Sequence, residues 1–385
     1  MEAVSELDTE LSHAASASQT ARELGPLFAE RANATADEDI YVADNISILK
    51  ASGLIEAGVP RELGGGGADV DELAAMLRTI GYHCGSTGLA FSMHTHQVAI
   101  PAWRWRHQNA TAVEPLLKRV ASERIMLLSS GGSDWIGGSG KAEKVDGGYR
   151  ITARKVFTSG APTGDVLMTS AVLDADGEAP TVLHFGLPMN SPHVKVLDTW
   201  RTLGMRGTGS HDVQVDGHVV PEAAVAVRRK AGEWHPLFQI ISTIAFPLIY
   251  AVYLGVAECA RDIAVNLAKR KAPGGHAIEL AGRMETELTG ARLAHEAMLA
   301  AVRRNSPSAE TVNDVMIGRQ LMARHAIAAV DYAMELAGGA GFYRPAGLER
   351  RFRDIQAARY HPLQSGPQAE YTGAMALGLP VDRIY

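Results

Sequence analysis

Residues 126–166 read MLLSSGGSDWIGGSGKAEKVDGGYRITARKVFTSGAPTGDV, and this stretch decides the fold that the rest of the chain accommodates. An apolar strand at 125–128 leads into a loop of small hydroxyl residues and glycines at 129–140. Alternating patterns at 148–152 and 155–157 predict two more strands, the second ending in Thr158 and Ser159. Hydroxyls and backbone N–H groups beside glycine can bind a planar heteroaromatic ring or a phosphate; two hairpins with polar turns are the alternative.

Composition and charge limit the possible functions. The 385 residues suffice for two or three domains, and the net charge of −6 excludes the basic surface that nucleic-acid binding requires. Cys84 and Cys259 lack metal-ligand spacing, so we expect both to be reduced and buried, and no metal site is predicted. The N-terminal residues lack the pattern of a secretory signal, so we expect a cytoplasmic protein.

The hydrophobic period divides the chain into three parts. We expect an N-terminal helical domain at 1–121, a middle β-domain at 122–230 and a C-terminal helical bundle at 231–385. The helical period covers residues 7–31, 44–52, 71–81, 88–103, 236–271, 279–304, 309–338 and 347–357, and strand patterns cover 166–173, 181–187, 194–197 and 213–215. The apolar run at 237–257 contains Gln239 and Pro247, which favours a buried helix kinked at Pro247 over a membrane span.

Four motifs in sequence order resemble the acyl-CoA dehydrogenase superfamily of flavoproteins. They are the stretch at 126–166, PRELGGGG at 60–67, LGMRGTGS at 203–210 followed by Val220-Pro221, and ELAGGAGF at 335–342 followed by Arg353-Asp354. The resemblance implies a mostly α fold with a central β-domain: an N-terminal α-domain, a middle β-barrel-like domain and a C-terminal four-helix bundle. It also implies a homotetramer built by that bundle.

The resemblance further implies a flavin cofactor, FAD with FMN as the alternative. Ser129, Ser130 and Ser133 lie in the loop that contacts the flavin in this family. Phe157 stands where the family places an aromatic residue beside the isoalloxazine ring, and Thr158 and Ser159 follow it.

A second set of flavin contacts is implied across a subunit interface. In the family, the element that resembles Gly338, Gly339 and Gly341 lets the adenosine pyrophosphate approach the backbone, and Arg270 or Lys271 would face a neighbour's phosphates. The family's usual Arg-x-x-Phe-Gly is replaced here by RKAPG at 270–274, and this departure keeps FMN open as the cofactor.

The residue expected to act as the catalytic base is missing. The family's glutamate follows the Arg-Asp pair by eight residues, where this chain has Pro362, and the alternative position near 244–247 has no carboxylate either. His361 is the nearest titratable group, and a pKa near neutrality would suit acid–base work. His94 and His96 lie on an apolar helix that lines the flavin side in the family. For all three histidines a structural role is the alternative.

Three functional hypotheses remain open. The first is a flavin-dependent oxidoreductase of acyl-CoA dehydrogenase type, acting on the CH–CH group of a small-molecule substrate such as a CoA thioester, with electron-transfer flavoprotein as partner. The alternative is the oxygenase component of a two-component flavin-dependent monooxygenase, supplied by a flavin reductase. Those enzymes share the fold, a histidine at the offset of His361 and the Ser-Gly pair seen at 159–160. The third is a flavin-binding scaffold without activity.

Overall fold

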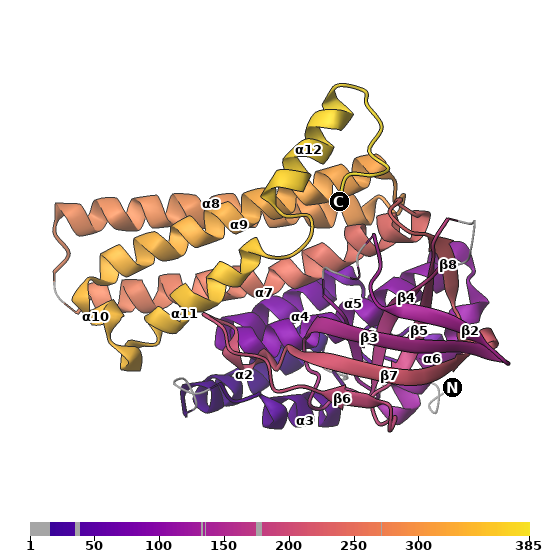
Figure 1. Ribbon diagram of the computed structural model, residues 1–385. Coiled ribbons are helices and arrows are strands. Elements are labelled where there is room, and N and C mark those ends of the chain that lie inside the picture. The colour runs from indigo at the N-terminus through magenta and orange to yellow at the C-terminus, as the bar shows by residue number, and fades with distance from the viewer. Residues whose placement is uncertain (1–15, 35–38, 132–133, 135, 175–178, 271) are drawn as a thin grey trace, which may run out of the picture.

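The computed structural model describes residues 16–34, 39–131, 134, 136–174, 179–270 and 272–385. Long helices run side by side through the C-terminal half, and a sheet lies at one end of them beside the N-terminal helices (Figure 1). The described helices are α2 (Ala17–Ala34), α3 (Ala43–Ala51), α4 (Val70–His83), α5 (Gly85–Gln108), α6 (Glu114–Glu123), α7 (Pro236–Ala268), α8 (Gly275–Arg303), α9 (Ala309–Ala337), α10 (Gly339–Phe342), α11 (Leu348–Ile355) and α12 (Ser365–Ala376). The predicted mostly helical fold with a central β-domain is confirmed.

One mixed sheet contains all the described strands. They are β1 (Leu127–Ser129), β2 (Lys141–Val145), β3 (Gly148–Thr158), β4 (Val166–Leu173), β5 (Thr181–Pro188), β6 (Val194–Val196), β7 (His211–Pro221) and β8 (Val227–Lys230). The order is β6-β7-β3-β2-β4-β5-β8, and β1 pairs in parallel with β4. The β1–β4 register places Ser129 opposite Met168, so the loop after β1 begins beside the middle of β4.

Several elements differ from the sequence predictions. The two strands predicted at 148–152 and 155–157 form the single strand β3. Helix α7 continues through Pro247, and the kink expected there stays a prediction. Strand β2 was not predicted because only Ala142 of its five residues is buried, so no apolar alternation marks it. Element type changes close to the predicted boundaries at 121 and 230, while the division into three domains stays a prediction.

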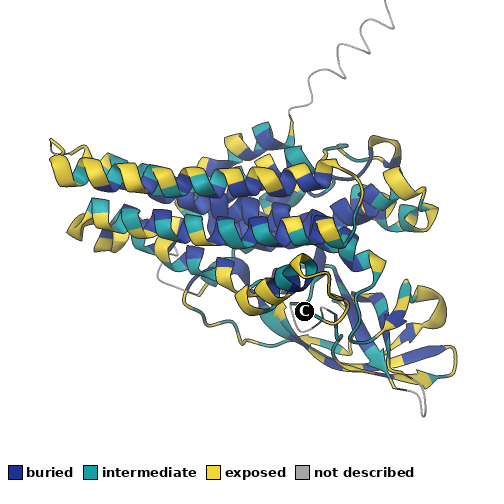
Figure 2. Cartoon of the chain, turned by 90° about the horizontal axis from the view of Figure 1, so that it is seen from above, coloured by how far each residue is buried: buried dark blue, intermediate teal, exposed yellow. Residues whose placement is uncertain are grey.

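Helix α7 is the core helix around which the other helices pack. Within the described residues it is the one helix long and apolar enough to cross a membrane, with a mean hydropathy of 2.0 over its most apolar window. Of that window 94% is buried inside the protein, against α4, α5, α8, α9 and α11. Figure 2 shows the buried residues concentrated on the inward faces of the long helices. The run at 237–257 is therefore the buried helix that its interrupting residues predicted.

Glycine allows α4 and α7 to cross with their backbones in contact. A Cβ added at Gly255 of α7 would overlap the carbonyl oxygen of Arg78, and one added at Gly81 of α4 would overlap that of Val252. Arg78 also donates from Nε to Glu258 at 2.7 Å, one turn along α7 from the crossing. The N-terminal helices and the bundle are therefore joined at a site that excludes any side chain.

We expect Gly255→Ala to lower the free energy of unfolding by about 1–3 kcal/mol, because the two helices must separate to admit a methyl group. Gly282→Ala is the matched control, since Gly282 is exposed on α8 and an added Cβ would meet no atom within 4 Å. In that control the free energy of unfolding should rise by about 0.5–1 kcal/mol, because alanine has a higher helix propensity than glycine. Urea unfolding midpoints measure both; equal stability of the two variants would show that the crossing is not tightly packed.

Candidate active site

A cavity of about 170 Å³ lies between the sheet, α5, α7 and the segment after α11. Its apolar lining includes Met93 of α5, Met168 of β4, and Phe238, Ile241, Phe246 and Ile249 of α7. Its polar lining includes serines, threonine and histidines that are far apart in the sequence. An apolar cavity with a few convergent polar groups is the usual form of a small-molecule site.

Two of the predicted flavin-contacting serines, Ser129 and Ser130, line this cavity. Ser130 Oγ lies 3.0 Å from Thr169 Oγ1 on β4. Gly131 N–H donates to the carbonyl of Val156 at 2.9 Å, so the serine loop lies directly against the end of β3, as the sequence predicted. Ser133 lies outside the described residues.

Phe157, Thr158 and Ser159 border the serine loop without lining the cavity. Phe157 adopts a left-handed φ of 54°, and its side chain is 55% exposed. The Thr158 hydroxyl is buried and finds no hydrogen-bond partner among the described residues, while Ser159 Oγ lies 2.8 Å from Ser210 Oγ. A strained backbone under an exposed aromatic ring, next to an unpaired hydroxyl, is typical of a ligand site.

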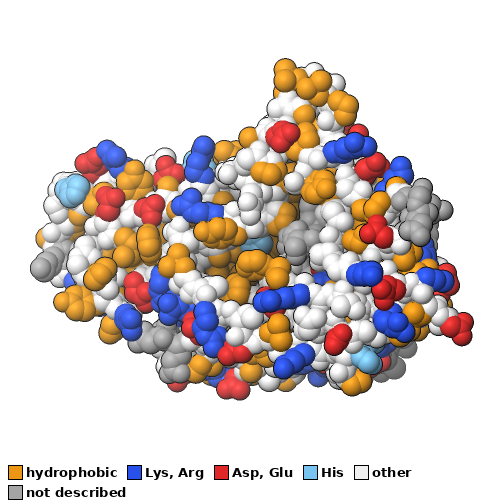
Figure 3. Space-filling view, viewed as in Figure 1, with side chains coloured by type: hydrophobic (Ala, Val, Ile, Leu, Met, Phe, Trp, Pro, Cys, Tyr) orange, Lys and Arg blue, Asp and Glu red, His pale blue; other side chains and the backbone are white. Residues whose placement is uncertain are grey.

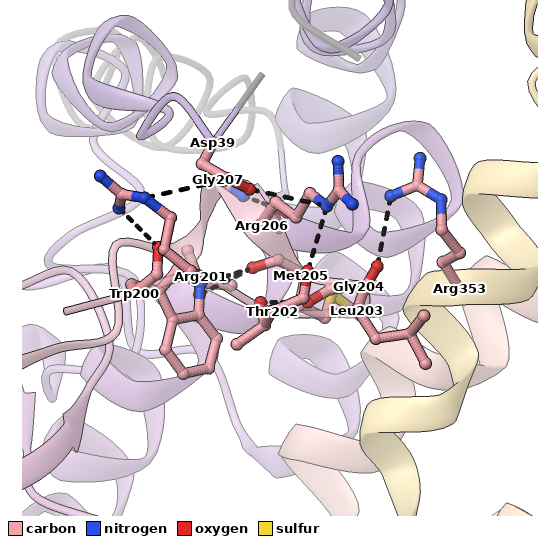
Figure 4. Close-up of polar contacts among 12 residues, drawn as sticks. Asp39, Trp200, Arg201, Thr202, Leu203, Gly204, Met205, Arg206, Gly207 and Arg353 are labelled. Carbon is pink, nitrogen blue, oxygen red and sulfur yellow. Dashed lines mark hydrogen bonds and ion pairs between the residues drawn. The ribbon is translucent and has the colours of Figure 1, made fainter. Parts of the chain in front are cut away.

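The loop between β6 and β7 holds Trp200 against Phe157, with ring centroids 5.8 Å apart in an edge contact. Figure 4 shows how this loop is fixed: Trp200 Nε1 donates to the carbonyl of Met205 at 3.1 Å, and Arg206 pairs with Asp39 at 3.5 Å. Arg353 of α11 donates to another carbonyl of the loop at 3.3 Å. The motif at 203–210 thus has a structural function, which is to brace the aromatic pair.

His361 lies where the sequence predicted, at the cavity. Its Nε2 is 2.7 Å from the Tyr253 hydroxyl of α7, and its carbonyl accepts from Arg319 Nη2 at 2.8 Å. Burial, together with the Arg319 cation and His96, lowers the pKa of His361 to about 3. The near-neutral pKa expected from the sequence is therefore wrong, and the ring stays neutral at physiological pH. Its role in catalysis stays a prediction.

His96 and His94 have different surroundings although both lie on α5. His96 lines the cavity, with Nδ1 donating to the carbonyl of Ser92 at 3.0 Å. His94 donates from Nε2 to the carbonyl of Ile55 at 2.8 Å and accepts at Nδ1 from Leu127 N–H at 2.9 Å. Because Nδ1 joins α5 to β1 and Nε2 joins α5 to the segment after α3, the catalytic role expected for His94 is replaced by a structural one. Burial lowers the pKa of each ring to about 4.

The predicted contacts to the adenosine half of FAD lie far from this cavity. Arg270 follows α7, and Gly338, Gly339 and Gly341 surround the start of α10, at the end of the bundle away from the sheet (Figure 1). Lys271 lies outside the described residues. Gly338 and Gly339 are open to solvent, since an added Cβ would meet no atom within 4 Å. Within one chain these residues do not meet the serine loop, so their predicted role requires a second subunit and stays a prediction.

Residues beyond the predicted set also shape the site. Lys155 of β3 is fully buried and its Nζ lies 2.6 Å from Asp134 Oδ1. The burial of Lys155 could have been predicted from the sequence. Ile151, Ala153 and Lys155 occupy alternate positions of β3, so their side chains point to the same, inward face of the sheet. The role of Tyr253 could not have been predicted in this way, since a tyrosine on an apolar helix is typical of a packed core.

Family profiles for the acyl-CoA dehydrogenase N-terminal and C-terminal domains match residues 10–120 and 248–365. A pigment production hydroxylase of a Rhodococcus species is 29% identical over 93% of this chain and 95% of its own length. An amino sugar nitrososynthase of Streptomyces peucetius is 27% identical over 86% of this chain and 85% of its own. A crystal structure of KijD3 with FMN and a dTDP-linked amino sugar has a TM-score of 0.86 and 25% identity, covering 96% of this chain and 95% of that one.

The chain belongs to the acyl-CoA dehydrogenase superfamily. Within that class it is a flavin-dependent oxidoreductase, since the homologues are flavin enzymes of the same fold. The residues present fit a flavin ring: the serine loop, the exposed Phe157 and the unpaired Thr158 hydroxyl are contiguous. They would supply an aromatic contact and hydrogen-bonding groups to it.

We expect Phe157→Gly to keep or raise the stability of the apoprotein, because glycine adopts the left-handed φ without strain and the ring buries little surface. The same change should weaken flavin binding, since the aromatic contact is lost. Thermal unfolding of the apoprotein and equilibrium flavin titration separate the two effects. A variant that binds flavin as tightly as the parent would remove Phe157 from the site.

The buried histidines make stability depend on pH. A folded-state pKa near 4 for His94 lies below the unfolded value of roughly 6.5, so this contribution is complete above pH 6.5 and is lost as pH falls toward 4. His94→Gln keeps one donor and one acceptor but cannot be protonated, so it should show a smaller drop in urea midpoint between pH 7 and pH 5. His193→Gln, at an exposed histidine, is the control and should keep the parental drop; an unchanged drop in His94→Gln would contradict the assignment.

Proposed function

We propose that the protein is the oxygenase component of a two-component flavin-dependent monooxygenase acting on a small, largely apolar substrate. The proposal rests on the polar side chains that line the cavity. They include neutral histidines, and no unpaired carboxylate is found among the described lining residues. Dehydrogenation of an acyl thioester needs a base that removes an α-proton, and this cavity does not supply one.

Asp134 is the carboxylate among the described lining residues, and it is already engaged. Its Oδ1 accepts from Lys155 Nζ at 2.6 Å and its Oδ2 from Thr169 Oγ1 at 3.0 Å. A carboxylate neutralised by a buried ammonium is a poor base, because taking a proton would leave that charge unpaired. The position of the family's glutamate is occupied by Pro362, which also lines the cavity.

His361 is suited to pass a proton at Nδ1 as a neutral ring, since its low pKa keeps it from holding an added proton. Tyr253 engages Nε2, and Nδ1 has no hydrogen-bond partner within the described part of the chain. Arg319 fixes the His361 backbone, and a second bond from its Nη1 to the carbonyl of Leu363 fixes the residues that follow. The ring is therefore held in one place by side chains from α7 and α9. Bound reduced flavin would supply the electrons and activate molecular oxygen.

The apolar residues of α5 and α7 would exclude water from this reaction. Phe238, Ile241, Phe246 and Ile249 follow one side of α7 and face the cavity. Activated oxygen is useful only where water and stray protons are kept out, so an apolar enclosure with few polar groups suits oxygenation. It also suits an apolar or aromatic substrate better than the long polar chain of a CoA thioester.

The relatives support oxygenation more than dehydrogenation. The pigment production hydroxylase and the amino sugar nitrososynthase are named for oxidation of small molecules, and KijD3 was crystallised with FMN. A separate flavin reductase would then be the partner, and FMN as well as FAD should be tested. The first hypothesis, acyl thioester dehydrogenation with electron-transfer flavoprotein, is the less supported one.

A homo-oligomer remains part of the proposal. Apolar side chains gather over α12 and along the bundle helices in Figure 3. Exposed apolar residues on these helical elements include Leu293, Phe342, Tyr343, Tyr360 and Leu377. Surface of this kind supports association through the bundle, as expected for the predicted homotetramer.

The decisive experiment mixes the purified protein anaerobically with photoreduced FMN or FAD and then admits oxygen. A monooxygenase should bind reduced flavin and oxygenate a panel of phenols, aryl sulfides and amines with consumption of one oxygen per product. A dehydrogenase should instead bleach its oxidised flavin with butyryl- or octanoyl-CoA under anaerobic conditions. A scaffold should do neither, and either of these two outcomes would overturn the proposal.

We expect His361→Ala to lower oxygenated-product turnover by roughly 10²–10⁴-fold, the range that a positioned acid–base group supplies. Affinity for reduced flavin should stay within a few-fold, because the aromatic contact and the hydroxyls that would bind the ring come from other residues. His193→Ala is the control and should leave turnover unchanged. Parental turnover in His361→Ala would mean that another group handles the proton.

A further inference from the structure

A chain of hydrogen bonds runs from the interior of the sheet to the cavity. It links Lys155 Nζ to Asp134 Oδ1 at 2.6 Å, Thr169 Oγ1 to Asp134 Oδ2 at 3.0 Å, and Ser130 Oγ to Thr169 Oγ1 at 3.0 Å. Lys155 is fully buried and Asp134 nearly so, while Ser130 is half-buried at the cavity surface. The serine hydroxyl is thus tied to a buried ion pair.

The acceptors around Lys155 fix its protonation state. Nζ lies 2.6 Å from Asp134 Oδ1, 2.8 Å from the carbonyl of Ser139 and 2.6 Å from the carbonyl of Ser170. The Ser139 hydroxyl oxygen is a fourth contact, at 3.1 Å, and only an ammonium group has three N–H donors to share among these acceptors. Burial lowers the pKa of Lys155, but the adjacent Asp134 carboxylate opposes that shift, and loss of one proton would leave one of these acceptors without a donor.

The charge on Asp134 fixes the direction of the next two hydrogen bonds. An ionised carboxylate only accepts, so the Thr169 hydroxyl must donate to Oδ2. With its single proton committed, Thr169 Oγ1 can only accept from Ser130. Ser130 has then used its own proton, and it presents only lone pairs to whatever the cavity binds.

We propose that Ser130, oriented by this relay, accepts a hydrogen bond from an N–H group that the flavin ring gains on reduction, and so favours the reduced flavin. This inference rests on the proposed function, in which the protein receives reduced flavin from a reductase. Reduction adds N–H donors to the isoalloxazine ring, at N5 above all, where the oxidised ring has acceptors. A hydroxyl that can only accept therefore discriminates between oxidised and reduced flavin. Lys155, Asp134 and Thr169 are positioning residues, because they orient the Ser130 hydroxyl as an acceptor.

The test compares the dissociation constants of oxidised and photoreduced FMN, measured anaerobically by fluorescence and absorbance titration. In Thr169→Val the Ser130 hydroxyl can rotate and donate. The ratio of the dissociation constants of oxidised and reduced FMN should therefore fall by about 2- to 12-fold, which corresponds to the net free energy of one hydrogen bond. Ser130→Ala should show a similar fall. Thr169→Ser keeps the hydroxyl and should restore the parental ratio, which a merely structural role of Thr169 would not require.

Thr286→Val, at an exposed threonine of α8, is the matched control for the chemical change and should keep the parental ratio. Equal changes of both dissociation constants in Thr169→Val, or none, would overturn the inference and leave the proposed function standing. If the unmodified protein bound neither form of FMN or FAD, the proposed function would fail and this inference with it.

Discussion

The burial of α7 is the constraint on which the other elements depend. This helix is apolar on nearly every side, so stability requires neighbours all round it, and the chain provides α4 and α5 on one side and α8, α9 and α11 on others. The same burial builds the site. The first turns of α7 line the cavity, and further along the Tyr250 hydroxyl donates to the carbonyl of Ala358 at 2.7 Å while Tyr253 meets His361.

Two buried cations organise two loops that line the cavity. Arg319 donates to backbone carbonyls of the segment that carries His361, and Lys155 donates to Asp134 and to carbonyls near the serine loop. A buried charge is tolerated only when acceptors surround it, so each cation holds its loop in one conformation.

The structure shows how one fold can accommodate different reactions. The connections that carry the family motifs are retained: Asp354 accepts from Met205 N–H at 2.6 Å, and α11 is tied to the loop that supports Trp200 and Phe157. Pro362 stands where the resemblance leads us to expect a glutamate, and burial keeps His361 beside it neutral. We therefore expect the reaction to depend on a few side chains that this support holds in place.

The sequence by itself determined the helical, β and helical order and the buried core helix, because periodicity and turn residues act locally. That the serine loop and the end of β3 belong to one site was implied by the family resemblance and not by any local pattern. The sequence also located His361 through a motif. Only the tertiary structure decided that His361 is neutral, that His94 is a structural link and that Lys155 orients Ser130 through Asp134 and Thr169. Desolvation and hydrogen-bond direction depend on atoms brought together from distant positions, and no local pattern in the chain encodes them.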